Sequence, residues 1–144
     1  MIEIIPFRYD NKLLSRLSKK IRQKVFVEEQ KVNAKLEYDG KDEDAFHYLC
    51  FFDEKPVGTA RWRFTTEGIK LERFAVIRQY RNQKIGQKLL EFVLMDVTKM
   101  PGKIYLHAQE KAVNYYQRAG FVTIGTAFYE AGIKHFKMVL SNKH

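Results

Sequence analysis

The segment Leu71–Gly86 has the residue order of an anion-binding site, because an apolar strand leads through a basic loop directly into an amphipathic helix. A helix N-terminus presents unpaired N–H groups and the positive end of its dipole, so a pyrophosphate could bind where this helix begins. Arg81 and Lys84 add positive charge to the loop. The segment alone leaves open a plain turn whose cations face water.

A carboxylate on the same strand is a second candidate for chemistry. Strand alternation places Glu72 on the face of Phe74, toward either the core or a substrate cleft. A buried carboxylate with a raised pKa could serve as a general base. An ion pair with Arg61, Arg63 or Arg73 on neighbouring strand positions explains Glu72 equally well.

The composition predicts one globular domain over residues 1–144. The chain is 45% hydrophobic and holds 11 Phe, 8 Tyr and 1 Trp against 3 Pro and 8 Gly, which excludes disordered and fibrous proteins. No apolar run approaches the roughly 20 residues of a membrane span, and the first residues do not resemble a secretory signal. The single cysteine, Cys50, fits a reducing compartment, so we expect a cytoplasmic protein without membrane association.

The net charge of +9 suggests an anionic partner, and the charge is unevenly distributed. Residues 32–54 hold seven acidic and two basic side chains, whereas residues 55–144 hold 16 basic and six acidic ones. Nucleic acid, an anionic membrane or a phosphate-bearing cofactor would each suit a basic domain. No helix-turn-helix or basic–aromatic RNA motif is recognisable, so nucleic-acid binding ranks last and is not expected. No Cys/His cluster has metal-ligand spacing, so we expect no metal.

Alternating strands and helices predict an α/β layer fold with a largely central sheet. A helix capped by Asp10 or Asn11 carries apolar residues at helical spacing as far as Val25, and its polar face is basic. A second helix begins near Ile85 and stops before Pro101, and a third covers about 110–119. Strands are predicted at Ile2–Phe7, His47–Phe52, Val57–Phe64, Ile69–Val76, Lys103–His107, Phe121–Thr126 and Ile133–Leu140.

Two segments resemble the GNAT superfamily of N-acetyltransferases. The acyl-CoA signature of that family, Arg/Gln-x-x-Gly-x-Gly/Ala after a strand, is matched by Arg81-Asn-Gln-Lys-Ile-Gly86, and its second segment is matched by Gln109–Phe121. Val25–Val32, the acidic stretch up to His47 and Ala131–Met138 resemble a small bacterial branch, so the resemblance covers nearly the whole chain. It implies a GNAT-type fold, with a central, mixed but mostly antiparallel sheet of six to seven strands and about four helices.

The resemblance implies that acetyl-CoA is the acyl donor and indicates where it binds. Backbone N–H groups of the strand would hold the pantetheine and polarise the carbonyl, and the loop and helix start would hold the pyrophosphate. Lys84 stands where the family usually has Gly, and we expect it to add a charge-assisted contact to the diphosphate. Asn82, often Gly in the family, tolerates a left-handed turn. The implied donor-site residues are Phe74, Ala75, Val76, Arg81, Asn82, Gln83, Lys84, Ile85, Gly86 and Asn114.

Tyr116 matches the family tyrosine that protonates the coenzyme A thiolate, so the resemblance implies that it is the general acid. The alternative is a tyrosine packed at the surface. Tyr115 takes the place of a family phenylalanine and is expected in the core. Asn114 is explained equally well as a polar residue on an exposed helix face.

The acceptor is expected to be a primary amine on a small molecule or a peptide. Glu28, Glu29 and Gln30 follow the first helix, where the family builds the acceptor side, and His47 could join them. Solvated carboxylates and a structural histidine are the alternatives, and the same caution applies to His107. Arg61 and Arg63 share a strand face and would suit a carboxylate or phosphate beside the amine.

Two further possibilities remain open at the level of the sequence. A non-catalytic acyl-CoA-binding regulatory module would keep the donor site without turnover, although Tyr116 argues against it. A homodimer could form by pairing of sheet edges, but nothing in the sequence specifies it.

Overall fold

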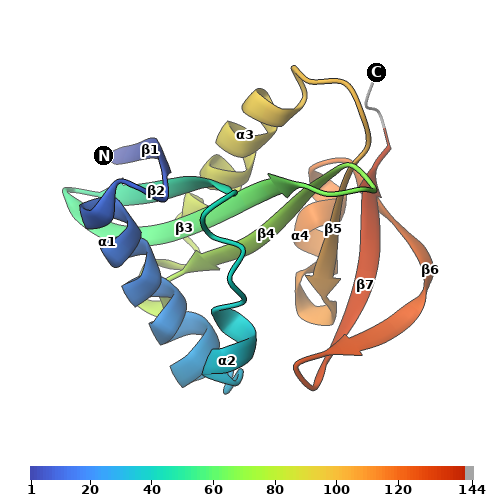
Figure 1. Cartoon of the computed structure of the whole chain (residues 1–144), viewed down its shortest axis with the longest axis horizontal. Coiled ribbons are helices and arrows are strands. Elements are labelled where there is room, and N and C mark those ends of the chain that lie inside the picture. Colours follow the sequence, from blue (N-terminus) through green and yellow to red (C-terminus); the bar gives the residue numbers. More distant parts are fainter. Residues whose placement is uncertain (142–144) are drawn as a thin grey trace.

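The computed structural model describes residues 1–141, and these form one seven-stranded sheet in the order β1-β2-β3-β4-β5-β7-β6 (Figure 1). All neighbouring strands are antiparallel except β4 and β5, which are parallel. This confirms the mixed, mostly antiparallel sheet. The strands are β1 (Ile2–Arg8), β2 (Phe46–Phe52), β3 (Lys55–Phe64), β4 (Ile69–Val76), β5 (Ile104–Gln109), β6 (Phe121–Glu130) and β7 (Ile133–Leu140).

Four α-helices flank the sheet: α1 (Lys12–Arg22), α2 (Ala34–Glu37), α3 (Ile85–Val97) and α4 (Val113–Arg118). Asn11 caps α1, because its side chain accepts a hydrogen bond from the Leu14 amide at 3.1 Å. The first helical segment does not end at α1, since a π-helical stretch, Gln23–Glu29, continues it. The short α2 was not predicted, because four residues hold too few apolar positions to show a period. Short 3₁₀ turns at Arg78–Tyr80 and Glu110–Ala112 precede α3 and α4.

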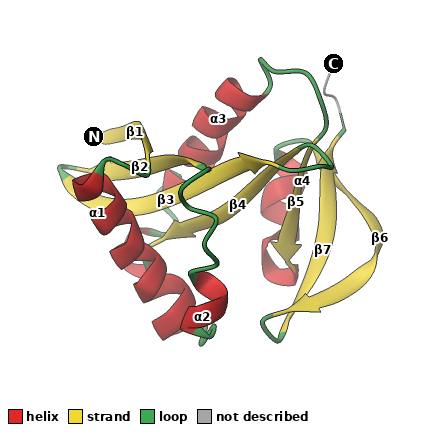
Figure 2. Ribbon diagram, viewed as in Figure 1, coloured by secondary structure: helices red, strands yellow, loops and turns green. Residues whose placement is uncertain are grey.

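The helices form layers on both faces of the sheet, with α1 and α2 on one face and α3 and α4 on the other (Figures 1 and 2). Ile21 and Val25 pack with Leu49 and Ala75 on the α1 face. The larger core lies on the α3 face and includes Leu71, Leu89, Val93, Leu106, Ala108 and Tyr116. Residues that belong to different cores therefore point to opposite faces of the sheet. None of the helices within residues 1–141 is long and apolar enough to cross a membrane.

The sheet opens between β4 and β5. These strands pair only at Ile69–Leu71 and Ile104–Leu106, and they diverge beyond that point (Figure 1). The register between β3 and β4 shifts at the same place, where Arg73 adopts a left-handed φ of 59°. One extra residue in one strand of a pair is a β-bulge, which bends and twists that strand.

The bulge corrects the expectation that Glu72 and Phe74 share a face. Phe74 packs against the α3-face core, whereas Glu72 pairs with Arg61 on the other face. Period-two alternation fails here because the extra residue at Arg73 resets it. The strands β5 and β6 also extend beyond their predicted ends, to Gln109 and Glu130.

Candidate active site

A cavity of about 910 Å³ lies where β4 and β5 diverge. Its walls come from both faces of the sheet, with α3 and α4 on one side and α2 and the β6–β7 hairpin on the other. The predicted site residues that line it are Gln30, Arg63, Glu72, Phe74, Ala75, Val76, Arg81, Asn82, Gly86 and Tyr116. The structure thus brings the two signature segments, which are about 30 residues apart in sequence, to one cavity.

The loop before α3 supplies the helix N-terminus. Asn82 and Lys84 both adopt left-handed backbone angles, with φ of 66° and 64°, and α3 begins at Ile85. The Ile85 side chain is buried in the core, so only its backbone can serve an anion. Asn82, Gln83 and Lys84 are exposed, and only Asn82 of the three lines the cavity.

The Arg81 guanidinium is already paired within the protein. It donates to Glu29 Oε2 at 2.7 Å and Oε1 at 2.8 Å, and its Nε donates to the Val76 carbonyl at 2.9 Å. The hydrogen bond from Arg81 is the main reason why the pKa of Glu29 falls to about 2. Arg81 therefore holds the loop against β4 and adds little free charge, and Glu29 anchors this loop instead of facing an acceptor.

The cavity-facing edge of β4 offers backbone donors. The Ile77 amide donates to the Val57 carbonyl of β3 at 2.9 Å. Successive amides of a strand point to opposite edges, so those of Val76 and Phe74 point toward the cavity and that of Ala75 points toward β3. These two amides lie where the parallel strand has departed, which leaves them available to a ligand.

Two adjacent tyrosines on α4 have different environments. The Tyr115 hydroxyl donates to the Gly86 carbonyl and ties α4 to the first turn of α3. Tyr116 is 8% exposed and packs its ring against Phe74 and Phe121. Its hydroxyl has no hydrogen-bond partner among residues 1–141, and burial raises its pKa, so it carries its proton at neutral pH. Asn114, on the same helix, is exposed and does not line the cavity.

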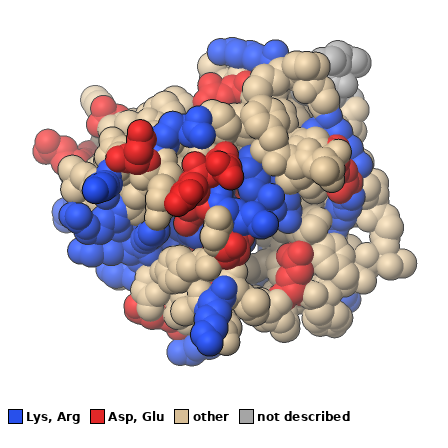
Figure 3. Space-filling model, viewed as in Figure 1, with Lys and Arg blue, Asp and Glu red and all other residues tan. Residues whose placement is uncertain are grey.

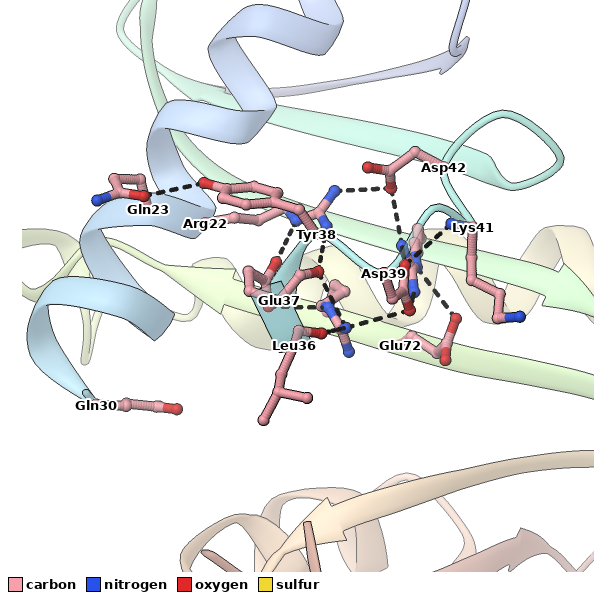
Figure 4. A network of polar contacts seen from close by, with 12 residues as sticks. Arg22, Gln23, Gln30, Leu36, Glu37, Tyr38, Asp39, Lys41, Asp42 and Glu72 are labelled. Carbon is pink, nitrogen blue, oxygen red and sulfur yellow. Dashed lines mark hydrogen bonds and ion pairs between the residues drawn. The ribbon is translucent and has the colours of Figure 1, made fainter. Parts of the chain in front are cut away.

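Glu72 is held in an ion-pair network (Figure 4). Its Oε1 accepts from Arg61 Nε at 3.1 Å and from Arg63 Nε at 2.8 Å. Although burial alone would raise the pKa of Glu72, these arginines and Lys70 lower it. This corrects the general-base hypothesis, which required a raised pKa, and confirms the ion pair weighed against it. Arg73 instead pairs with α2.

Carboxylates at the end of α2 and in the loop after it neutralise the remaining buried arginines (Figure 4). Arg22 pairs with Glu37 and Asp42, and Arg61 pairs with Asp39 and Asp42. Arg61 is 1% exposed and is fully engaged by these partners. It is therefore a structural cation, contrary to its expected contact with an acceptor anion. The acidic stretch in the sequence was the available signal for this network, but sequence spacing does not reveal which arginines it meets.

Two other predicted acceptor residues lie away from the cavity. His47 is buried, stacks on Phe7 and lies 2.9 Å from the Asp42 carbonyl, and burial lowers its pKa. These contacts fit the structural alternative for His47. Glu28 lines a separate basic groove along α1. Gln30 does line the cavity, where its Oε1 accepts a hydrogen bond from Gln109 Nε2 at 2.7 Å.

The β5–β7 side of the cavity holds His107, which the sequence analysis weighed only with caution, and two residues that it did not single out. His107, Glu130 and His135 line the cavity together, and His107 Nδ1 lies 2.9 Å from Glu130 Oε2. The sequence placed His107 at a strand end, but its neighbours come from β6 and β7 and could not be identified from spacing. Within residues 1–141, no group of three or more His, Cys, Asp or Glu side chains is arranged to hold a metal ion.

Comparisons with known proteins agree with this geometry. The sequence model described as the acetyltransferase (GNAT) domain matches residues 11–142. The uncharacterized N-acetyltransferase YjcF of Bacillus subtilis (strain 168) is 35% identical over 123 residues, which are 83% of this chain and 86% of YjcF. The crystal structure of Escherichia coli ElaA matches with a TM-score of 0.86 and 29% identity over 98% of this chain and 100% of ElaA. An aminoglycoside 6'-N-acetyltransferase complexed with coenzyme A shares the fold, with a TM-score of 0.75 and 14% identity over 95% of each chain.

The family model and the relatives place the chain in the class of acyl-CoA-dependent N-acetyltransferases, and the split sheet agrees with that class. The chain belongs to the GNAT acetyltransferase family, and acetyl-CoA is its acyl donor.

Proposed function

We propose that the protein transfers the acetyl group of acetyl-CoA to a primary amine of a small molecule or peptide by direct attack, with Tyr116 as the general acid. The observation that carries the proposal is the cavity at the β4–β5 split, which is lined by β4, the start of α3 and Tyr116 together. We also propose that residues 1–144 act as one domain and that the acceptor enters from the α2 and β6–β7 side.

The reaction needs a stabilised oxyanion and a proton for the leaving thiolate. As the amine nitrogen bonds to the carbonyl carbon, negative charge develops on the carbonyl oxygen, and the Phe74 and Val76 amides are suited to receive it. When the carbon–sulfur bond breaks, the sulfur takes the hydroxyl proton of Tyr116. Tyr116 keeps its proton at neutral pH, and its place in the cavity beside Phe74 supports this role.

The acceptor itself is restricted by the polar wall of the cavity. Arg63, unlike Arg61, lines the cavity, but its Nε and Nη2 are bonded to Glu72. A carboxylate or phosphate beside the amine would therefore compete with Glu72 for Arg63. This favours acceptors whose neighbouring groups are polar without a strict requirement for an anion.

Calorimetric titration with acetyl-CoA tests the donor site, with free coenzyme A and ATP as controls. We expect one site per chain with micromolar affinity. A screen of primary amines, followed by thiol release, then tests transfer. Binding without release for any amine would support the non-catalytic regulatory module, and no binding by the folded protein would overturn the proposal.

A further inference from the structure

The acetyl-transfer proposal leaves the proton of the attacking amine without a destination, and the carboxylates near the cavity are unsuited to receive it. Glu72 is bonded to Arg61 and Arg63. Glu37 and Asp39 are likewise paired with buried or half-buried arginines. Burial raises the pKa of Glu37, but Arg22 holds its Oε2 and Arg73 holds its Oε1. Proton uptake by any of these carboxylates would therefore break ion pairs with arginine.

His107 on β5 has a nitrogen free for this task. Its Nδ1 lies 2.9 Å from Glu130 Oε2, and an ionised carboxylate can only accept a hydrogen bond. In the neutral ring the proton therefore sits on Nδ1, and Nε2 carries the lone pair. Nε2 has no hydrogen-bond partner among residues 1–141. The histidine hydrogen bond lowers the pKa of Glu130, which keeps that carboxylate ionised.

The neighbouring histidine lacks this freedom. His135 Nδ1 lies 2.7 Å from the Ile133 carbonyl, so it carries the proton, and its Nε2 lies 3.8 Å from Glu130 Oε1. Its second nitrogen thus faces the carboxylate that orients His107. The ring of Phe128 fills the space beside both histidines, 4.9 Å from His107 and 6.0 Å from His135 between ring centres.

The position of His107 in the sheet suits an incoming amine. Leu106 and Ala108, its neighbours along β5, belong to the α3-face core with Tyr116. Alternation therefore directs His107 to the opposite face, the face of α1 and α2. Both His107 and Tyr116 line the one cavity. With His107 on one face of the sheet and Tyr116 on the other, the amine can give its proton to His107 while the thiolate receives one from Tyr116.

We propose that His107 is the general base for the acceptor amine and that Glu130 positions it; this rests on the acetyl-transfer function proposed above. As the nitrogen of the amine bonds to the carbonyl carbon, it loses a proton to Nε2 of His107, and the ring becomes an imidazolium paired with Glu130. The carbon–sulfur bond then breaks, and the sulfur takes the proton of Tyr116. Water returns a proton to Tyr116 and takes one from His107.

Kinetics of His107→Asn with acetyl-CoA and the best amine of the screen test this assignment. We expect kcat to fall by about a hundredfold or more, with the acetyl-CoA affinity unchanged. Lys137→Gln is the matched control, because Lys137 is opposite His107 in the β5–β7 register but does not line the cavity. A His107→Asn enzyme with wild-type kcat would overturn the proposal.

The pH profile separates a base from a structural histidine. The acidic limb of the kcat/KM profile should be kept in His135→Asn and lost in His107→Asn. Loss of the acidic limb in His135→Asn, with the limb kept in His107→Asn, would show that His107 is not the base. Tyr105 on β5, Glu130 on β6 and Lys137 on β7 lie next to His107. Lys70 on β4 and His135 on β7 interact with the same Glu130 carboxylate.

A measurement without an acceptor keeps the proposal separate from the acetyl-transfer function. Nitrogen-15 NMR of histidine-labelled protein should show neutral His107 with its proton on Nδ1, and Glu130→Gln should weaken this preference. A proton on Nε2 in the wild type would overturn the inference even if acetyl-CoA binds. Failure of acetyl-CoA to bind would instead reject the proposed function.

Discussion

Lys84 combines a backbone cost with a charge at the start of α3. Its left-handed φ of 64° costs a residue with a Cβ roughly 1 kcal/mol, which glycine avoids. Its side chain is exposed immediately before the first turn of α3, where we expect the pyrophosphate to bind. A glycine at this position would relax the backbone of the loop, whereas Lys84 adds a positive charge to it.

Replacement of Lys84 by Gly should weaken acetyl-CoA binding about three- to tenfold, because a charge-assisted contact is lost. The melting temperature should stay level or rise as the backbone relaxes. Calorimetry and thermal denaturation measure the two effects separately. Lys88→Gln, which removes one charge farther along α3, is the control. Tighter binding by Lys84→Gly would mean that the lysine crowds the diphosphate.

At the scale of elements, the segment from the end of α2 to Asp42 connects α1 to β3 and β4. Glu37, Asp39 and Asp42 meet arginines from α1, β3 and β4 in one network (Figure 4). Burial alone would raise the pKa of Asp39, but the hydrogen bond and charge of Arg61 lower it to about 2. Asp39 therefore contributes stability above its unfolded pKa of about 4, and this contribution is lost as the pH falls toward 2.

Asp39→Asn should lower the melting temperature at pH 7 by about 3 °C, and the difference from the wild type should vanish as the pH approaches 2. Thermal denaturation between pH 7 and pH 2 measures it. Asp44→Asn, a change at an exposed carboxylate nearby, is the control. A gap that persists at pH 2 would show that the Asp39 charge is not its cause.

Some elements could be predicted from the sequence alone, and others could not. Periodicity predicted β4, α3 and β7 closely, because each has a clear apolar pattern. The bulge at Arg73 was not predicted, since nothing in the residue types signals an extra residue in a strand. The pairing of Arg81 with Glu29 and of His107 with Glu130 depends on contacts across 52 and 23 residues, which local patterns do not encode.

For the whole molecule, the distribution of charge is more informative than its sum. Basic side chains gather over α1, and acidic and basic side chains lie next to each other at the centre of the same face (Figure 3). Much of the buried charge is neutralised in pairs. On the face drawn in Figure 3, acidic side chains interrupt the basic ones, so the net charge of +9 is not spread there as one basic surface of the kind that a nucleic-acid backbone would follow.

A labelled DNA duplex or RNA strand should show no saturable binding at physiological salt in fluorescence anisotropy. Weak association at low salt should disappear as salt is added, because only surface cations take part. Acetyl-CoA should still bind at the same salt. Tight nucleic-acid binding with a steep salt dependence would instead favour the nucleic-acid-binding alternative.

A homodimer stays a prediction for the whole molecule. The edge strand β6 exposes Val122 and Ile124, each more than one-third accessible, where a second sheet edge could pair. Sedimentation equilibrium of the wild type measures the mass directly. A monomer at high protein concentration would reject the dimer.

The adjacent tyrosines of α4 provide the most direct test of the proposed acetyl transfer with Tyr116 as general acid, because Tyr116→Phe and Tyr115→Phe each remove one hydroxyl from the same helix. With acetyl-CoA and a primary amine, Tyr116→Phe should lower kcat about ten- to a thousandfold at unchanged acetyl-CoA affinity. Tyr115→Phe should leave kcat within a few-fold of the wild type, since it loses only the bond to the Gly86 carbonyl. Equal turnover by Tyr116→Phe and the wild type would contradict the general-acid role of Tyr116.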